Sequence, residues 1–480
     1  MIFDNEEDIE ILDLDEAVIK VEKKVITEEV EVNNNFDKRE NNDIKKVINK
    51  KEKKKLSTIF QIVFCSISLI FIIGCCIFYG SRLFKYYRIY NPKPSSGEKI
   101  SLLANEITSK SEIVYENDGL YISGGNYIYK GNVLNNYLRY NNMLWKIVKI
   151  NKDDTIDIIL DDYINVLSGD SKNIDYIKSD IYNYLNDYFL NNINKSLLSP
   201  LSICTDKFDK LNELSCNNKE DNGYVSLLDV SNFLNSVVDG NSYLVSNDEI
   251  FWLSNQGSEK VWHTNGVNVS MSKSDSFYEV RPLVTLKAAV VLYGGDGSKD
   301  NPYIIEKNEN KLSVGSYVKL DEDLWIVYNK DKNIHLTLGK TLENQYHFSS
   351  KETDFDMEIK NSLAEYLNTT YLDSLSYKDI LIEEEWNNGL FKGSYKDVID
   401  KKVKSMVSIP SVMDLKFNSD ISNYLLMTAN DDGLVYTYGE IVKTGKPSIY
   451  RNIRPCISIS DKTNIKSGSG SYSDPFVLEV

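Results

Sequence analysis

Residues 280–303 read VRPLVTLKAAVVLYGGDGSKDNPY, and residues 453–476 read IRPCISISDKTNIKSGSGSYSDPF. The two stretches share three landmarks in one ungapped register: an Arg-Pro pair, a Gly-x-Gly-Ser segment, and a proline followed by an aromatic residue. Chance rarely keeps three landmarks in one register, and such self-similarity is typical of a repeated structural unit. The two stretches therefore predict that the chain contains two copies of one domain.

Earlier landmarks recur in the same order ahead of each stretch, and they set the extent of the two copies. The matched segments are 144–148 with 324–327, 184–186 with 366–368, 225–227 with 407–409, 251–254 with 425–428, and 261–262 with 435–436. We expect two tandem homologous domains, at residues 121–307 and 311–480.

Each copy is expected to have an α+β fold, with helices packed on a mostly antiparallel sheet. Residues 143–160 alternate β-branched with polar residues around an Asn-Lys-Asp-Asp turn, which predicts a hairpin. Residues 180–193 carry apolar side chains at helical spacing, and residues 359–371 repeat that spacing. A short strand and a second helix are expected at 225–234, and short strands at 281–292.

Residues 56–81 contain no charged side chain and predict a single transmembrane helix. About 20 apolar residues are enough to cross the hydrocarbon core of a bilayer. The segment begins too far from the N-terminus for a cleaved signal peptide. A buried helix of a soluble protein would show a polar face, which this segment lacks.

The distribution of basic residues sets the expected orientation. Lysines crowd residues 45–55, whereas only Arg82, Lys85 and Arg88 follow the apolar segment closely. Because basic residues remain on the cytoplasmic side, we expect a cell-membrane protein with its N-terminus inside and its C-terminal domains outside. Residues 82–120 are expected to form a stalk.

Residues 1–55 are expected to form a disordered cytoplasmic tail. Residues 1–37 are strongly acidic, with apolar and acidic residues alternating at 9–15. Such a composition cannot bury a core. Two interpretations remain open for it, a solvated tail and a short motif that folds on a cytoplasmic partner.

Composition excludes some classes of function. The 480 residues include 55 Lys+Arg and 71 Asp+Glu, for a net charge of -16, which argues against a nucleic-acid partner. Hydrophobic residues make up 42%, enough for packed cores. The three histidines, His263, His335 and His347, and the cysteines are too scattered to predict a catalytic set, a metal site or a cofactor.

The glycine-rich turn at 295–301 contains two aspartates but lacks the spacing of an EF-hand calcium loop. The second copy keeps the glycines at 468–474 and loses most of the charge. A metal site would need the carboxylates more than the glycines, so the pattern favours a tight turn.

Several residues are predicted to have structural roles. Trp145 and Trp325 lie in apolar strands and are expected in the core. Arg281 and Arg454 precede proline in the same frame. Because a charge inside a strand costs several kcal/mol unless it is paired, we expect salt bridges or contacts with carbonyl groups.

Three cysteines lie after the apolar segment. Cys204 and Cys216 predict an extracytoplasmic disulfide, whose loop closure contributes roughly 3 kcal/mol. Cys456 follows the second Arg-Pro pair and is interpreted as a small buried apolar residue.

Residues 127–150, with YIYKG, NN and LWKIVKI, resemble a group of uncharacterised single-pass surface proteins of low-GC Gram-positive bacteria. Those proteins open with YYRG…NNxxFxxxxWKIVR and end with VRPVIxLK…GDGTxxNPY. The segments FWLS at 251–254, VWHTNG at 261–266 and YEVRPLV at 278–284 also resemble the C-terminal half of C-type-lectin-like and formylglycine-generating-enzyme-like domains. This resemblance implies a compact α+β fold often used for recognition. A formylglycine-generating enzyme uses a cysteine pair, whereas the second copy contains Cys456 alone.

Residues 254–278 are rich in Ser, Asn and Gly and are expected to form an exposed connection with little strand beyond 261–262. Trp262, His263 and Tyr278 are the candidate ligand-binding residues, because flat aromatic faces stack on sugars and anchor protein partners. The alternative for Trp262 is a core position.

These patterns favour a non-catalytic binding or adhesion protein that recognises a glycan, a wall polymer or a protein. One alternative is a transmembrane sensor that couples an outer ligand to a cytoplasmic partner. A lesser alternative is an envelope enzyme of the formylglycine-generating type.

Overall fold

The computed structural model describes residues 101–479, apart from 170–174, 246–248, 308–310, 394–397, 418–420 and 440–441. Contacts divide the chain into two units, residues 1–88 and 89–480, and every described residue belongs to the second. The predicted cytoplasmic tail and transmembrane helix, and the stalk up to residue 100, lie outside the described residues. No helix within the described part is long and apolar enough to cross a membrane.

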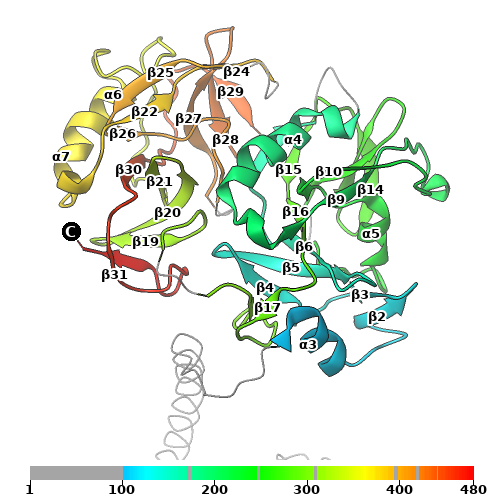
Figure 1. Cartoon of the computed structure of the whole chain (residues 1–480). Helices are drawn as coiled ribbons and strands as arrows, with labels where there is room; N and C mark the ends of the chain where they lie inside the picture. Colours follow the sequence, from blue (N-terminus) through cyan, green and yellow to red (C-terminus); the bar gives the residue numbers. More distant parts are fainter. Residues whose placement is uncertain are drawn as a thin grey trace, which may run out of the picture. The chain divides into compact units, whose positions relative to one another are not determined.

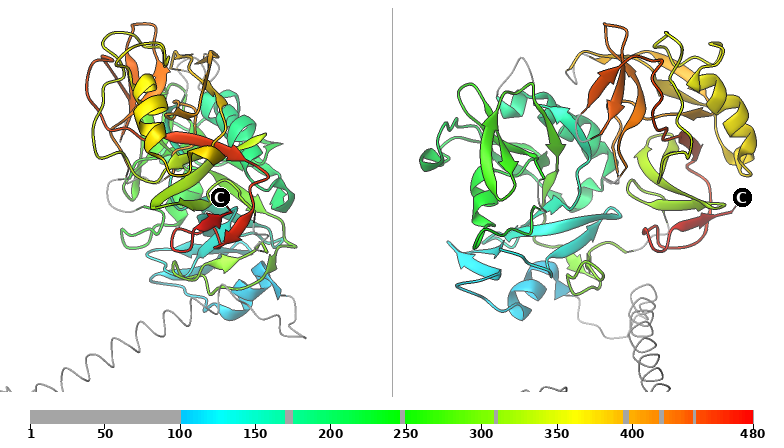
Figure 2. Two further views of the ribbon diagram at one scale, coloured as in Figure 1. Left: turned by 90° about the vertical axis from the view of Figure 1, so that its left-hand side faces the viewer. Right: turned by 180° about the vertical axis from the view of Figure 1, so that it is seen from behind.

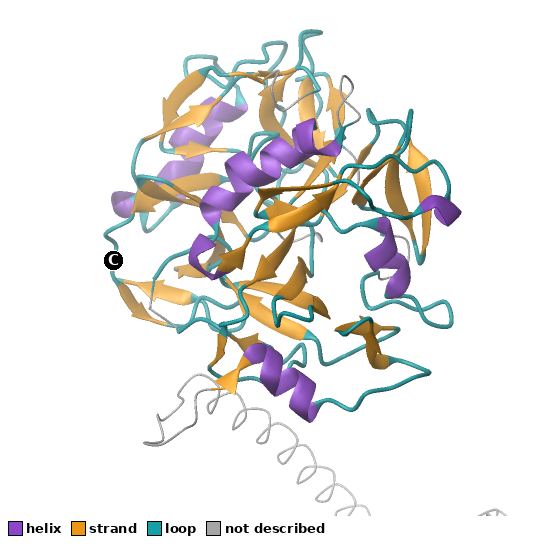
Figure 3. Cartoon of the chain, turned by 45° about the vertical axis from the view of Figure 1, so that its right-hand side comes forward, coloured by secondary structure: helices purple, strands orange, loops and turns teal. Residues whose placement is uncertain are grey.

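The described unit is rich in mostly antiparallel β-structure with short helices (Figures 1 and 3). The larger sheet follows the order β11-β16-β6-β5-β3-β2, with β4 also on β5, β18 on β4 and β8 on β16. Its strands are β11 (Val225–Ser226), β16 (Leu283–Leu286), β6 (Ile156–Leu160), β5 (Met143–Ile150), β3 (Asn126–Lys130), β2 (Gly119–Ser123), β4 (Tyr137–Tyr140), β18 (Tyr303–Ile304) and β8 (Leu198–Ser199).

A second sheet has the order β26-β30-β21-β20-β19-β32-β31. Its strands are β26 (Val407–Ser408), β30 (Cys456–Ser460), β21 (Asn333–Leu338), β20 (Asp323–Lys330), β19 (Tyr317–Leu320), β32 (Phe476–Leu478) and β31 (Ile465–Ser467). From β26 to β32 it has the same order and directions as β11-β16-β6-β5-β4-β18, with four antiparallel pairs followed by one parallel pair.

Smaller sheets complete each half of the unit. In the first half they are β12 (Trp252–Gln256), β13 (Val261–Asn265) and β14 (Asn268–Ser272); β15 (Phe277–Val280) with β7 (Asn165–Ser168); and β9 (Leu201–Cys204) with β10 (Lys219–Gly223). In the second half they are β24 (Val398–Ile399), β23 (Leu390–Phe391), β27 (Tyr424–Ala429), β28 (Val435–Tyr438) and β29 (Lys443–Gly445); and β22 (Glu384–Asn387) with β25 (Lys402–Ser405).

Helical segments lie where the apolar spacing predicts them. The first is α4 (Asp180–Asn183), which continues through a π-helical turn at Tyr184–Tyr188 and a 3-10 turn at Phe189–Asn192. In the second half, α6 (Leu363–Tyr366), a π-helical turn at Leu367–Tyr371 and α7 (Leu372–Ser374) follow one another. The expected short helix after β11 is α5 (Val230–Asn235).

An asparagine in each π-helical turn joins the helix to a strand. Asn186 Nδ2 donates to the carbonyl of Val225 at 2.9 Å, and its Oδ1 accepts from the Val225 N–H at 3.2 Å. Asn368 makes the same two bonds with Val407, at 2.9 and 3.0 Å. Each side-chain amide therefore acts as a further peptide group at the end of β11 or β26.

The expected stalk boundary at residue 120 is wrong, because residues 101–120 belong to the folded unit. β1 (Ser101–Leu102) pairs with β17 (Val291–Leu292), and α3 (Leu103–Lys110) follows it. Three apolar side chains of α3 are at most 1% exposed: Leu103, Ala104 and Ile107. They form one helical face, whose burial fixes the helix on the body.

The expected exposed connection at 254–278 is also wrong. These residues form most of the β12-β13-β14 meander and the start of β15. The hairpin between β13 and β14 turns at Gly266, which has a left-handed φ of 57°. Polar residues are compatible with this sheet because β14 is an edge strand whose side chains are partly exposed.

One of the matched segments is shifted by one residue. Phe251 makes a parallel bridge with Glu279, and Tyr424 makes one with Asn452; both partners lie two positions before an Arg-Pro pair. The N–H of Ser254 bonds to the Leu228 carbonyl, as that of Met427 does to Pro410. Phe251 therefore corresponds in its contacts to Tyr424, and not to Leu425 as the sequence suggested.

The two halves meet at a surface that we call the junction. Its apolar part combines Val166 of β7 and the partly buried Tyr163 and Phe277 with residues of the second half: Phe391, Val412, Ile421, Tyr424, Leu426, Tyr436, Tyr438 and Val442. Backbone and side-chain bonds add to it. The N–H of Lys416 donates to Ile164 O at 2.7 Å, and Ser168 Oγ donates to Gly393 O at 2.8 Å. Figure 2 shows the two halves from two further sides.

Candidate functional site

The two arginines before proline are buried and bound by carbonyl groups. Arg281 is 2% exposed; its Nε and Nη2 donate to Leu160 O at 3.1 and 2.9 Å, and its Nη1 donates to Leu244 O. Its guanidinium carbon lies 4.7 Å from the centre of the Phe251 ring, and its Nη1 forms an ion pair with Glu249 Oε2 at 3.7 Å. These contacts tie strand ends to loops, so Arg281 has a structural role.

Arg454 has a similar environment in the second half. It is 1% exposed, and its Nε donates to Leu338 O at 2.8 Å. Leu338 pairs with Trp325 in the sheet, as Leu160 pairs with Trp145. Trp145 and Trp325 are both 0% exposed, so each arginine fixes a strand next to a buried tryptophan.

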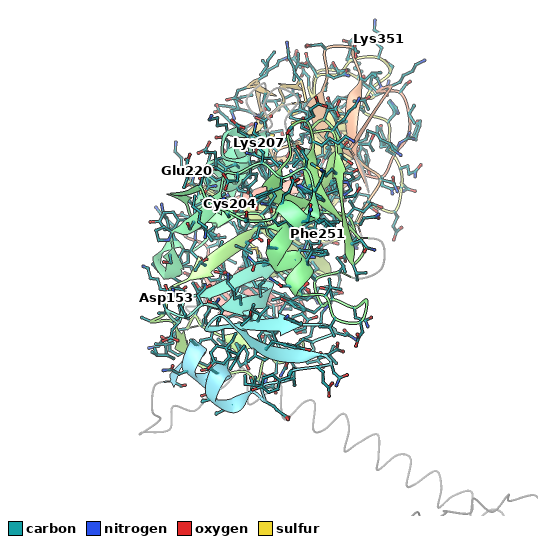
Figure 4. The ribbon with its side chains drawn as sticks, turned by 90° about the vertical axis from the view of Figure 1, so that its right-hand side faces the viewer. Asp153, Cys204, Lys207, Glu220, Phe251 and Lys351 are labelled. Carbon is teal, nitrogen blue, oxygen red and sulfur yellow. A yellow bond between two sulfur atoms is a disulfide. The ribbon has the colours of Figure 1, made fainter. Side chains whose placement is uncertain are left out.

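Cys204 and Cys216 are joined in a disulfide that links β9 to the loop before β10 (Figure 4 labels Cys204). Asp206 lies beside them, and these three residues form the single His/Cys/Asp/Glu cluster of the described part with ligand-like spacing. The two sulfur atoms are bonded to each other, so they are not metal ligands. Cys456 is fully buried, and burial raises the pKa of its thiol to about 12.

The predicted stacking residues Trp262 and His263 lie inside the protein, which is a correction to the expected site. Trp262 is 5% and His263 is 6% exposed, because both lie on β13, the central strand of its sheet. Trp262 Nε1 donates to Phe208 O at 2.8 Å. The core alternative therefore holds for Trp262, and neither ring offers a free face.

His263 and Tyr278 are brought together, with Ser272 between them. His263 Nδ1 is 2.7 Å from Thr264 O, its Nε2 is 2.8 Å from Ser272 Oγ, and Ser272 Oγ is 2.8 Å from Tyr278 OH. Because a carbonyl only accepts, Nδ1 carries the proton and Nε2 accepts from Ser272. Burial lowers the His263 pKa, which favours this neutral ring.

The indole ring of Trp252 packs against both aromatic residues of this hydrogen-bonded chain. The Trp252 ring packs edge-on against Tyr278 at 4.7 Å and His263 at 6.2 Å. A serine beside a neutral imidazole could act as a nucleophile. In this network, however, every polar group already has a partner, and we interpret it as structural.

The second half carries a partly exposed aromatic group that was not predicted from the sequence. It contains Tyr346, His347, Tyr366 and Tyr450, and we call it the tyrosine surface. Tyr346 stacks in parallel with Tyr366 at 4.7 Å and with His347 at 5.1 Å between ring centres. Tyr450 is 55% exposed, and its ring centre lies 5.1 Å from that of His347.

Backbone pairing positions these rings. Tyr346 and Arg451 exchange two backbone hydrogen bonds of 3.0 Å, which brings the segment after β21 beside the turn before β30. Tyr366 comes from α6, whose N-terminus is capped by Ser362. The rings thus rest on a strand-like pair and a capped helix, which limits their motion.

Amide groups lie beside the rings. Gln345 Nε2 donates to Asn452 Oδ1 at 3.0 Å, and the Gln345 side chain is exposed. Ile449 adds an apolar side chain that is 38% exposed. Burial raises the pKa of Tyr346, so this phenol is neutral at ordinary pH. The tyrosine surface can therefore stack on a flat apolar face and exchange hydrogen bonds at its rim.

The signal for this surface was the presence of aromatic residues within polar segments, at 346–347 and at 450. Residues 254–278 carry the same signal, but there strand β13 buries Trp262 and His263. Comparison with family models, with curated proteins and with solved structures finds no match.

Proposed function

We propose that this chain is a membrane-anchored, extracytoplasmic and non-catalytic binding protein, built from two copies of one domain. The observation that carries the proposal is the tyrosine surface, where three tyrosines and a histidine gather at the protein surface. Exposed aromatic clusters are characteristic of ligand surfaces, because solvent-exposed rings gain most by stacking on a partner.

Shared architecture supports the duplication. The two main sheets have matching strand order, and Arg281 and Arg454 each bind a carbonyl next to a buried tryptophan. A Cβ atom at Gly295 would lie 2.0 Å from Pro302 O, and one at Gly468 would lie 2.1 Å from Pro475 O. Both Gly-x-Gly segments therefore need glycine for the same close approach, as tight turns do.

The anchor and its orientation rest on the sequence. The uncharged segment 56–81 and the lysines before it support a bilayer anchor with the domains outside the cell membrane. The acidic segment 1–37 favours the sensor as a second candidate, with a cytoplasmic partner for this tail. The enzyme alternative finds no support in Cys456, which is buried and has no cysteine partner in its copy.

The proposal is tested with the full-length chain in lipid nanodiscs, used to capture isolated cell-envelope fractions. We expect the wild-type chain to retain envelope material and the Tyr450→Ala chain to lose most of it. Tyr115→Ala is the matched control, because Tyr115 is 87% exposed and lies outside the tyrosine surface. Equal capture by both variants and by the wild-type chain would overturn the proposed surface.

A further inference from the structure

We infer that the tyrosine surface binds the flat face of one pyranose ring of an uncharged, β-linked oligosaccharide, and that the chain has one such site although it has two domains. This inference rests on the proposed function and on the proposed duplication.

The tyrosine surface lies at the position in the second half that corresponds to the β7-β15 pair of the first half. The N–H of Ile164 bonds to Val280 O, and the N–H of Leu342 bonds to Ile453 O. Further along, Leu167 pairs with Tyr278, as Tyr346 pairs with Arg451. Tyr450 therefore stands where the first half has Phe277.

In the first half, the β7-β15 surface is covered by residues of the second half. Val166 and Phe277 pack in the junction against the β27-β28 sheet, and Ser168 Oγ bonds to Gly393 O. Asn165 is 1% exposed, and its Nδ2 donates to Val412 O at 2.9 Å. A ligand has no access to this surface, so within the described residues the second half alone offers this site.

The second half has an aromatic residue, Tyr450, at the place of Phe277 and has Tyr346 at the place of Leu167, but it lacks the apolar docking residue. Between the matched positions, the first half has Asn165 and Val166, whereas the second half has Glu343, Asn344 and Gln345, all exposed. This segment cannot repeat the apolar contact of Val166, so a third domain or a second copy of the chain is not the partner that the surface fits. These three exposed polar residues instead form a rim beside the tyrosine rings.

The charges favour an uncharged ligand. Glu343 and Glu365 lie near the rings and oppose a phosphate-rich polymer. Arg451 is one nearby cation, and its Nη1 already donates to Tyr450 O at 2.9 Å; the exposed Lys446 lies in the turn that leads to Tyr450. Anion-binding surfaces need several basic groups, and here the carboxylates of Glu343 and Glu365 offset the charges of Arg451 and Lys446.

A β-linked gluco-configured sugar matches a surface with an exposed tyrosine ring and neutral amide groups at its rim. Its substituents are equatorial, so the ring presents a flat C–H face to Tyr450 and directs its hydroxyl groups outward to Gln345 and Asn452. Tyr346, Tyr366 and His347 stack on one another, which leaves Tyr450 as the most exposed ring of the tyrosine surface. The amides can donate and accept hydrogen bonds, as sugar hydroxyls require.

The test is calorimetric titration of the full-length chain in nanodiscs with β-1,4-linked N-acetylglucosamine tetramer and with cellotetraose. Poly(glycerol phosphate) is the charged control. We expect at least one neutral sugar to bind with one site per chain and poly(glycerol phosphate) not to bind. Tyr450→Ala should weaken sugar binding roughly tenfold or more, Tyr450→Phe should keep it, and Tyr115→Ala should leave it unchanged.

Two sites per chain, sugar binding that Tyr450→Ala leaves intact, or no binding of either neutral sugar would overturn the inference. Unchanged melting temperatures of the Tyr450 variants exclude a folding defect, as expected for a side chain that is 55% exposed. If neither sugar binds but envelope capture still depends on Tyr450, the inference fails and the proposed function stands. If capture is also independent of Tyr450, both fail.

Discussion

Lys416 is a buried cation at the edge of the junction. Its Nζ donates to Ser411 O at 2.7 Å and also to the carbonyls of Val412 and Asp414. The ring centre of Tyr438 lies 5.6 Å from Nζ, and Arg454 is a second buried cation nearby. The carbonyls of Val412 and Asp414 also accept from Asn165 of the first half, so Lys416 and Asn165 bind the same turn at the junction.

Burial lowers the pKa of Lys416 to about 7, despite the opposing effect of Asp414. The unfolded chain, with a lysine pKa of about 10.4, binds more protons between these two values. Stability contributed by this group therefore rises as the pH increases from about 7 to about 10. We expect the difference in unfolding free energy between the wild-type chain and Lys416→Met to grow in favour of wild type from pH 7 to pH 9.5.

Urea unfolding of the two chains at both pH values measures this difference. Every other titrating group is common to the two proteins, so their effects cancel. A difference that stays constant, or that shrinks at the higher pH, would show that Lys416 keeps an ordinary pKa.

At the scale of elements, the π-helical turns depend on one amide each. Asn368 Oδ1 accepts from the N–H groups of Met406 and Val407, and its Nδ2 donates to Val407 O. Asn368→Ala removes the side-chain acceptor of the Met406 and Val407 N–H groups, whereas Val407 O keeps its bond from Ser405 Oγ. Because Val407 is 0% exposed, we expect a loss of about 2–4 kcal/mol in unfolding stability.

Chemical denaturation measures this loss, and Asn344→Ala, at an exposed position, should change stability by less than about 0.5 kcal/mol. Asn186→Ala should have an effect like that of Asn368→Ala, because its bonds to Val225 match. A clear effect at one of the two positions alone would contradict the equal role assigned to the two amides.

Elements with strong periodicity could be predicted from the sequence, and those fixed by side-chain contacts could not. The hairpin at 143–160 and the helix at 180–193 follow from alternation and from helical spacing. The strands within 254–278 escaped because β14 is a partly exposed edge whose polar residues read as a loop. The π-helical turns were not predicted, because the hydrogen bond from the asparagine side chain of each turn joins residues far apart in the sequence.

At the scale of the whole molecule, the junction was not predictable. Val166, Phe391 and Tyr436 lie in apolar strands, and pattern alone assigns such residues to the core of their own domain. The structure places them in one shared cluster between the halves. For the same reason the tyrosine surface was missed, because which half leaves this place exposed depends on how the two halves meet.

The proposed membrane topology rests on the sequence, and it gives the last prediction. Lysines crowd residues 45–55, and few basic residues follow the apolar segment 56–81. Protease added to intact protoplasts should therefore remove the domains and leave an N-terminal epitope protected, as immunoblots with tags at both ends would record. Glutamine in place of the lysines at 50–55 removes most of this asymmetry and should yield chains of both orientations. Digestion of the N-terminal tag in the wild-type chain would contradict the prediction. It would place the tail outside the cell and the domains inside.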